Sequence, residues 1–87
     1  MRIDKFLKVS RLIKRRELAK ALCEAGDVKI NGKAAKPSSE VKEGDVLEIH
    51  IGRHIIEARA KELRMSALKS QAESMYEITK DQIVGLA

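Results

Sequence analysis

Hydrophobic positions recur at helical spacing in the first part of the chain and alternate with polar positions afterwards, with the change at Gly26. The helical spacing predicts one helix over residues 4–12 and a second over residues 15–25. Gly26 is the expected end of the second helix, because glycine readily adopts the left-handed conformation found after a helix C-terminus. The predicted apolar stripe of the second helix consists of four residues: Leu18, Ala19, Leu22 and Ala25.

A β-hairpin is predicted directly after Gly26. Residues 28–30 alternate between apolar and polar, and Asn31-Gly32 follows them. This dipeptide is the strongest short signal for a two-residue hairpin turn, because both positions tolerate positive φ. Residues 33–36 can pair back as the second arm.

Two further strands are predicted over residues 47–51 and 54–60, which also alternate between apolar and polar side chains. The fold class is therefore α+β, with two N-terminal helices packed on a small, mostly antiparallel sheet. We place the domain at residues 1–65 and assign residues 66–87 to a short C-terminal extension, whose composition is compatible with a helix up to Glu77. Its last residues are expected to fray, and three of its side chains are expected to dock on the core: Met75, Tyr76 and Ile78.

Positive charge is concentrated at the N-terminus. Residues 1–20 contain eight Lys or Arg and two acids, whereas residues 21–87 contain ten basic residues and eleven acids. The net charge of +5 is therefore due to the N-terminal segment. A field of one sign over a short segment favours binding to polyanions, of which nucleic acid is the commonest.

The aromatic content limits how the chain can bind nucleic acid. Phe6 and Tyr76 are the only aromatic residues, and Trp is absent. Proteins that recognise single strands by stacking bases need aromatic side chains on their binding surface. We therefore expect contacts mainly to phosphates and to the shape of the nucleic acid.

The sequence contains no set of residues typical of an enzyme or a metal site. Cys23 is the only cysteine, so neither an intrachain disulfide nor a cysteine-based metal site is possible, and we expect it to be buried. His50 and His54 have no plausible nucleophile beside them, and neither paired carboxylates nor a phosphate-binding glycine loop is present. We expect a non-enzymatic protein without a cofactor.

No segment of the sequence suggests export or membrane insertion. The chain begins with Met-Arg-Ile-Asp, without the apolar run of a secretory signal behind it. No stretch approaches the ~18 consecutive apolar residues of a membrane-spanning helix. We expect a cytoplasmic protein.

Most runs of charged residues are simply solvated helix faces, but three details favour a function for the positive charge of residues 1–20. Its cations are hardly interleaved with acids. Lys14, Arg15 and Arg16 cluster at a helix start, where cations are disfavoured by the helix dipole. The predicted hairpin also adds three lysines: Lys29, Lys33 and Lys36.

The order of these motifs resembles the alpha-L RNA-binding motif, also called the S-four domain, over about residues 1–60. Three features support the resemblance: the Arg-x-x-Ala step from Arg16 to Ala19, the Gly-x-Val-x-Ile-Asn-Gly run of residues 26–32, and Gly44 followed by an aspartate. The resemblance implies a two-helix RNA-binding surface backed by a small sheet.

Longer strings resemble stand-alone members of this class, namely the RqcP family and the small ribosome-associated heat-shock protein. These strings are residues 2–16, the Ala-Lys-Pro-Ser-Ser-Glu-Val of residues 35–41, and the Met-Tyr-Glu-Ile of residues 75–78. The RqcP resemblance implies binding to rRNA of the obstructed large ribosomal subunit and to peptidyl-site tRNA. It also implies a partner of the RqcH type, which adds a C-terminal alanine tail to the stalled chain. We expect the protein to be a monomer.

The resemblance also implies which residues contact RNA. Asp4 is expected to orient an arginine or cap its helix, and Arg16 is expected to face solvent. Many family members have Ser where this chain has Arg15, which puts the usual N-cap of the second helix in doubt. Together with two neighbouring cations, the predicted site is Arg2, Asp4, Lys5, Lys8, Arg11, Lys14, Arg15, Arg16, Lys20, Lys29, Asn31 and Lys33.

Two other functions remain open from the sequence. A relative of the heat-shock type would move peptidyl-tRNA on free large subunits without tailing. A small DNA-binding regulator would use the two helices as a helix-turn-helix. Loss of alanine tailing when the chain is deleted would favour the RqcP-type function over the heat-shock type. Competition between duplex DNA and ribosomal RNA would separate the RqcP-type function from a DNA-binding regulator.

Overall fold

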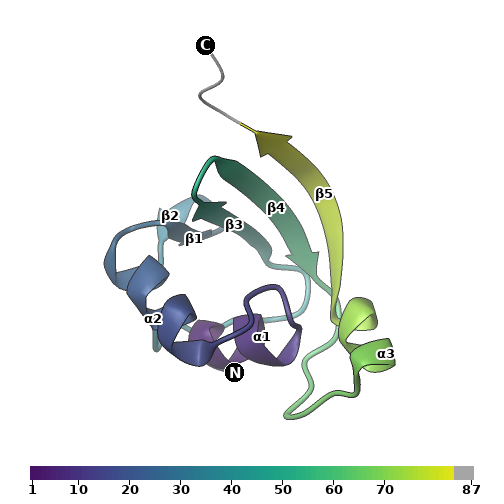
Figure 1. Cartoon of the computed structure of the whole chain (residues 1–87). Coiled ribbons are helices and arrows are strands. Elements are labelled where there is room, and N and C mark those ends of the chain that lie inside the picture. Colours follow the sequence, from purple (N-terminus) through teal and green to yellow (C-terminus); the bar gives the residue numbers. More distant parts are fainter. Residues whose placement is uncertain (84–87) are drawn as a thin grey trace.

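The structure of the chain is a computed structural model that describes residues 1–83 (Figure 1). Two helices, α1 (Ile3–Val9) and α2 (Arg16–Glu24), pack on one another and cover one face of an antiparallel sheet. The sheet has the strand order β2-β1-β3-β4-β5. Its strands are β1 (Val28–Ile30), β2 (Lys33–Ala34), β3 (Val46–Ile51), β4 (His54–Ala60) and β5 (Tyr76–Ile83). The predicted α+β fold is confirmed.

The first helix is shorter than predicted. It ends at Val9 because Arg11 adopts a φ of 62°, and the amide of Arg11 donates to the carbonyl of Lys8 at 3.1 Å. This is the usual way in which a helix ends, but the left-handed position is normally taken by Gly or Asn. The prediction of a helix to residue 12 was wrong because nothing in the sequence marks an arginine for this conformation.

The second helix lies within one residue of its predicted ends. Gly26 has a φ of 81°, its amide donates to Cys23 and the next amide donates to Leu22, so the helix ends in a complete Schellman motif. At the other end, Arg15 is the N-cap and its side chain makes no capping hydrogen bond. The usual side-chain N-cap, which the sequence puts in doubt, is therefore absent from this helix.

The predicted hairpin forms between β1 and β2. Asn31 and Gly32 have φ values of 51° and 83°, the two positive values that a type I′ turn requires. The second arm is shorter than the four residues expected, since β2 ends at Ala34. The later strands are close to their predicted ranges, because β3 begins one residue earlier than expected and β4 matches.

The C-terminal segment differs from the prediction. Within residues 66–83, only α3 (Lys69–Ala72) and the 3-10 turn η1 (Glu73–Met75) are helical. The next eight residues form β5, which pairs with β4 along its whole length and makes the outer edge of the sheet. The fraying expected at the end of the chain falls on residues 84–87, which lie outside the described residues.

The core lies between the two helices and the sheet. Phe6, Leu7, Leu47 and Ile49 are fully buried there. Cys23 is buried as expected, and burial raises the pKa of its thiol to about 11, with the charges of nearby Asp4 and Glu24 acting in the same direction. No helix among the described residues is long and apolar enough to cross a membrane.

Three expected core contacts are wrong. Leu18 is 46% exposed, Ile78 is 44% exposed, and Ala25 is also exposed. By contrast, Met75 is fully buried and Tyr76 packs against the core. The buried side of α2 consists of Ala19 and Cys23, with Leu22 partly buried beside them. The predicted apolar stripe of α2 is shifted by about one position from the observed buried side. The sequence does not distinguish the two orientations of the helix, because both would bury small apolar residues.

The exposure difference between two leucines of α2 is testable. We expect Leu22→Ala to lower the free energy of unfolding by about 1–2 kcal/mol, less than full burial would give. Leu18→Ala should change it by less than about 0.5 kcal/mol, since its side chain is largely in water. Urea unfolding of both variants measures the change in the free energy of unfolding. Equal losses would contradict the orientation of α2, in which Leu22 is partly buried and Leu18 is exposed.

Candidate nucleic-acid interface

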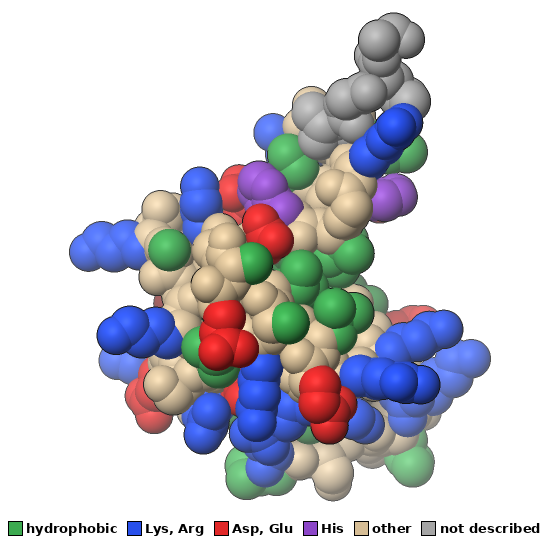
Figure 2. Space-filling model, turned by 60° about the vertical axis from the view of Figure 1, so that its left-hand side comes forward, with side chains coloured by type: hydrophobic (Ala, Val, Ile, Leu, Met, Phe, Trp, Pro, Cys, Tyr) green, Lys and Arg blue, Asp and Glu red, His purple; other side chains and the backbone are tan. Residues whose placement is uncertain are grey.

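Cations from both helices lie on one side of the molecule. Figure 2 shows Lys and Arg side chains gathered on its lower part, at the level of the helices, with fewer Asp and Glu among them. We call the surface formed by the cations of residues 1–20 the basic face, and its exposed members are Arg2, Lys8, Arg11, Lys14, Arg15 and Lys20. Lys5 and Arg16 belong to the same segment but are partly buried.

A buried carboxylate lies beneath the basic face and joins its two helices. Asp4 of α1 is fully buried and accepts two hydrogen bonds from Arg2, each 3.2 Å long. It also accepts one from Arg16 of α2 at 3.4 Å, and one from the backbone amide of Lys5 at 2.8 Å. The Arg16 Nε is 3.3 Å from the second carboxylate oxygen of Asp4 but makes no hydrogen bond. Asp4 therefore holds both guanidinium groups in place.

Ionisation of Asp4 is favoured although the residue is buried. Burial alone raises the pKa of its carboxyl, but the hydrogen bonds from Arg16 and the Lys5 amide and the charges of Arg16 and Arg2 outweigh it. The pKa consequently lies below its usual value. The Asp4 carboxylate neutralises part of the positive charge of Arg2 and Arg16. Its hydrogen bonds also fix the orientation of these two side chains.

Arg16 faces solvent only in part, whereas a fully solvent-facing side chain is expected from the sequence. Its side chain is 39% exposed, because its head group turns inward to Asp4. An Arg16 substitution therefore alters both the fold and the surface, and it is a poor test of binding alone. The sequence does not reveal this contact, since Asp4 and Arg16 are twelve residues apart and belong to different helices.

The remaining cations of the basic face are free to meet a ligand. Within residues 1–83, none of Lys8, Arg11, Lys14, Arg15 and Lys20 takes part in an ion pair. Like charges held together without counter-ions attract a polyanion and release its bound cations. This set is the part of the predicted site best suited to contact phosphates.

The hairpin residues do not join this set. Lys29 lies on the face of the sheet away from the helices and is 3.7 Å from Glu48. Asn31 uses its side chain internally, donating to Asp45 at 3.1 Å and accepting from the Val46 amide at 2.9 Å. Lys33 is exposed on the edge strand β2. Lys29 and Asn31 thus use their side chains within the sheet and the turn, and Lys33 belongs to the hairpin rather than to the helices.

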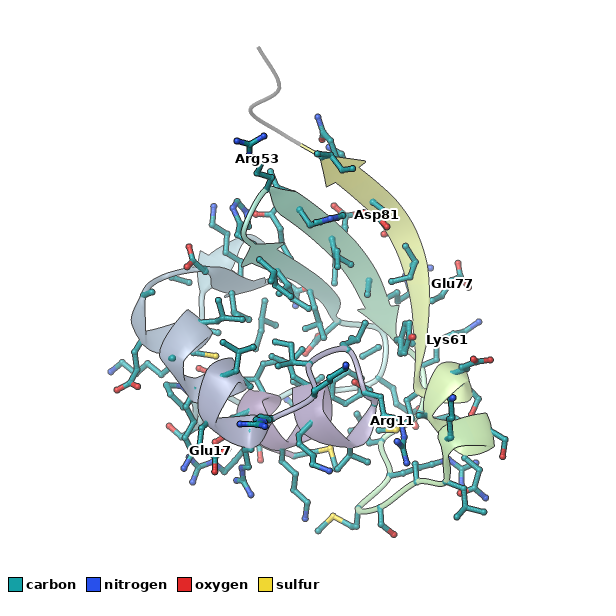
Figure 3. All side chains as sticks on the ribbon, in the orientation of Figure 1. Arg11, Glu17, Arg53, Lys61, Glu77 and Asp81 are labelled. Atoms are coloured by element: carbon teal, nitrogen blue, oxygen red, sulfur yellow. The ribbon has the colours of Figure 1, made fainter. Side chains whose placement is uncertain are left out.

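Sequence reasoning missed one cation near the basic face. Lys69 of α3 lines a cavity together with Lys8, Arg11 and Lys14. Figure 3 shows Arg11 reaching from the turn after α1 toward the C-terminal segment. No sequence signal identifies Lys69, because its place depends on how residues 61–75 return from the sheet to the helices.

The histidines do not form a catalytic set in the described part of the chain. His50 is 2.9 Å from Glu48 and His54 is 3.5 Å from Asp81, so each lies beside a carboxylate. The hydrogen bond from His50 and the charge of Lys29 hold the pKa of Glu48 below its usual value, despite the opposing effect of burial. Among residues 1–83, no group of three or more His, Cys, Asp or Glu is placed to hold a metal ion.

Two basic helices packed on an antiparallel sheet define a small α+β domain whose surface suits a polyanion. The family model of the S4 domain matches residues 1–47. The chain is 48% identical over 85 residues to a protein of Bacillus subtilis named "RQC P-site tRNA stabilizing factor", covering 98% of this chain and 99% of that one. The chain therefore belongs to the S4 domain family, in the group that contains these factors.

Solved structures with the same fold extend the similarity beyond residue 47. The trimeric structure of Heat Shock Protein 15 from Vibrio cholerae matches with a TM-score of 0.84 and 30% identity, covering 91% of this chain and 81% of that one. The solution structure of a hypothetical protein, HP1423, matches with a TM-score of 0.79 and 34% identity, covering 94% of this chain and all of the other. Both matches include much of the C-terminal segment.

Proposed function

We propose that this chain is a non-enzymatic RNA-binding factor of ribosome quality control. It binds the obstructed large ribosomal subunit and contacts both the large-subunit rRNA and the tRNA in the peptidyl site. It steadies that tRNA while a tailing factor of the RqcH type adds alanines to the C-terminus of the stalled chain. It acts in the cytoplasm as a monomer, and residues 1–65 supply the RNA-binding domain.

The observation that carries this proposal is the set of unpaired cations on the basic face. Five exposed cations from α1, α2 and the turn between them have no ion-pair partner among residues 1–83. A relative named as a P-site tRNA stabilizing factor aligns with nearly the whole chain and supports tRNA as one ligand. The described residues offer binding groups and no catalytic constellation, which favours a role in binding.

The mechanism follows from the kind of residues on the basic face. Lysine and arginine side chains displace counterions from the phosphates that they contact, so affinity falls as salt rises. With only two aromatic residues in the chain, base stacking contributes little. Asp4 fixes the directions of Arg2 and Arg16, so these two arginines recognise the spacing of phosphates rather than base identity.

A second candidate is a factor that moves peptidyl-tRNA on free large subunits without tailing. The similarity to Heat Shock Protein 15 of Vibrio cholerae favours it, since the two folds agree over 91% of this chain. Both candidates use the same surface and differ in what happens to the stalled chain after binding.

Co-sedimentation with large ribosomal subunits, followed by a tailing assay, tests the proposal. We expect the purified chain to sediment with subunits that contain peptidyl-tRNA, and binding to fall steeply between about 50 and 200 mM salt. Cells lacking the chain should lose alanine tails on stalled products. Unchanged tails together with accumulated peptidyl-tRNA would favour the second candidate. Binding to duplex DNA as tight as binding to the subunit would contradict both.

A further inference from the structure

We propose that the C-terminal segment completes a phosphate-binding pocket on the basic face, formed by Lys8, Arg11, Lys14 and Lys69. The ligand is the sugar-phosphate backbone of RNA, and this assignment rests on the proposed function. The pocket extends the interface beyond residues 1–47, where the S4 family model ends. It gives α3 a role in binding as well as in packing.

The four side chains come from three separate parts of the fold. Lys8 belongs to α1, Arg11 and Lys14 to the turn before α2, and Lys69 to α3. They line a cavity of about 340 Å³, and no acidic side chain of residues 1–83 lies in its wall. All four are exposed, and none forms an ion pair within the described residues. Four like charges around one cavity repel each other and are relieved by an anion.

A second cavity lies beside the pocket. Lys8 and Arg11 also line a neighbouring cavity of about 240 Å³, whose other wall is residues 65–67 of the C-terminal segment. Because both cavities have Lys8 and Arg11 in their walls, they lie next to each other between the helices and the C-terminal segment. Two adjacent cavities beside the same cations suit a phosphodiester backbone better than a single isolated phosphate.

The backbone on both sides of the pocket holds the cations in place. Arg11 has a φ of 62°, a conformation that costs energy for any residue with a side chain, and strain of this kind is concentrated at functional sites. On the other side, Ala72 and Met75 are buried in the core, and Gln71 accepts a hydrogen bond from the Leu68 amide at 3.1 Å. Lys69 therefore projects from a packed segment.

A salt titration of RNA binding tests the pocket. The probe is an unmodified tRNA transcript, and its dissociation constant is measured from about 50 to 200 mM KCl for wild type and Lys69→Gln. If Lys69 contacts one phosphate, the slope of log K against log salt should become less steep by about 0.7–0.9. Circular dichroism should show the same fold, because the Lys69 side chain is exposed.

Arg53→Gln is the matched control. It removes the same unit of charge, but Arg53 lies in the turn between β3 and β4 at the far end of the molecule from Arg11 (Figure 3). Its slope should equal that of wild type. A Lys69→Gln slope equal to wild type, with Arg11→Gln reducing the slope, would overturn the role of Lys69 and leave the proposed function intact. Wild-type binding without any salt dependence would instead overturn the proposed function.

Competition separates RNA from a small phosphate ligand. Inorganic pyrophosphate is added at constant ionic strength to wild type and Lys69→Gln, each bound to the tRNA transcript. We expect equal and small displacement from both proteins, since two adjacent cavities suit an extended backbone better than a small anion. Selective displacement from wild type would assign the pocket to a free phosphate compound and overturn the assignment to RNA.

Discussion

Asp4→Ala is expected to lower the free energy of unfolding by about 2–3 kcal/mol. Removing one partner of a fully buried ion pair costs about 3–5 kcal/mol, and here the loss is smaller because both guanidinium groups are partly exposed. The variant leaves Arg16 with a buried Nε and no carboxylate beside it. Urea unfolding measures the change, and Glu24→Ala, which removes an exposed carboxylate from α2, is the matched control.

The same variant separates the effect of charge on RNA binding from the effect of orientation. Asp4→Ala makes the basic face more positive, so a purely electrostatic surface would bind RNA more tightly. We expect weaker binding, because Arg2 and Arg16 lose the carboxylate that fixes their directions. Tighter binding by a folded variant would show that their geometry is unimportant.

The contribution of Asp4 also depends on pH. Its pKa in the folded protein lies below the value of about 3.9 expected in the unfolded chain. The ionised carboxylate therefore stabilises the fold fully above that value, and the contribution disappears as pH falls through the folded-state pKa. The stability difference between wild type and Asp4→Asn should be constant from about pH 7 to 5 and shrink below about pH 4. A difference that persists at acidic pH would contradict this.

Most of the fold could be predicted because its signals are local. Gly26 ends α2, Asn31-Gly32 turns the first hairpin, and alternation places β3 and β4, each within a few neighbouring residues. The early end of α1 was missed because Arg11 adopts a conformation that its side chain does not favour. The strand β5 was missed for a different reason. It is almost wholly exposed, so its sequence lacks the alternation that burial imposes.

The candidate site, like the fold, has a part that the sequence predicts and a part that depends on tertiary structure. Charge density identifies the helical segment, because a run of cations with few acids among them is visible in the sequence. Which cations are free is a tertiary property, and the sequence shows neither the contact of Arg16 with Asp4 nor that of Lys29 with Glu48. The position of Lys69 beside Arg11 likewise depends on α3 packing near α1. The sequence therefore indicates the ligand class, and the structure selects the residues to test.

The double variant Lys14→Glu, Arg15→Glu should weaken binding to large ribosomal subunits by about 100-fold at 0.1 M salt with the fold intact. Both side chains are exposed and make no ion pair among residues 1–83. Each reversal removes a phosphate contact and adds a repulsion, which together we take as about 1–1.5 kcal/mol per residue at this salt. Stability should rise slightly, because acids replace cations at the start of α2, where the helix dipole favours negative charge.

This rise in stability is what makes the variant decisive. A surface needed only for solubility or helix stability would tolerate the change, whereas a binding surface loses affinity while the fold becomes more stable. The double variant Lys42→Glu, Arg53→Glu alters net charge equally outside the basic face and should weaken binding only a few-fold through the long-range field. Co-sedimentation at several salt concentrations compares the two, and equal losses would mean that net charge alone attracts RNA. A much larger loss for Lys14 and Arg15 places the RNA at the start of α2.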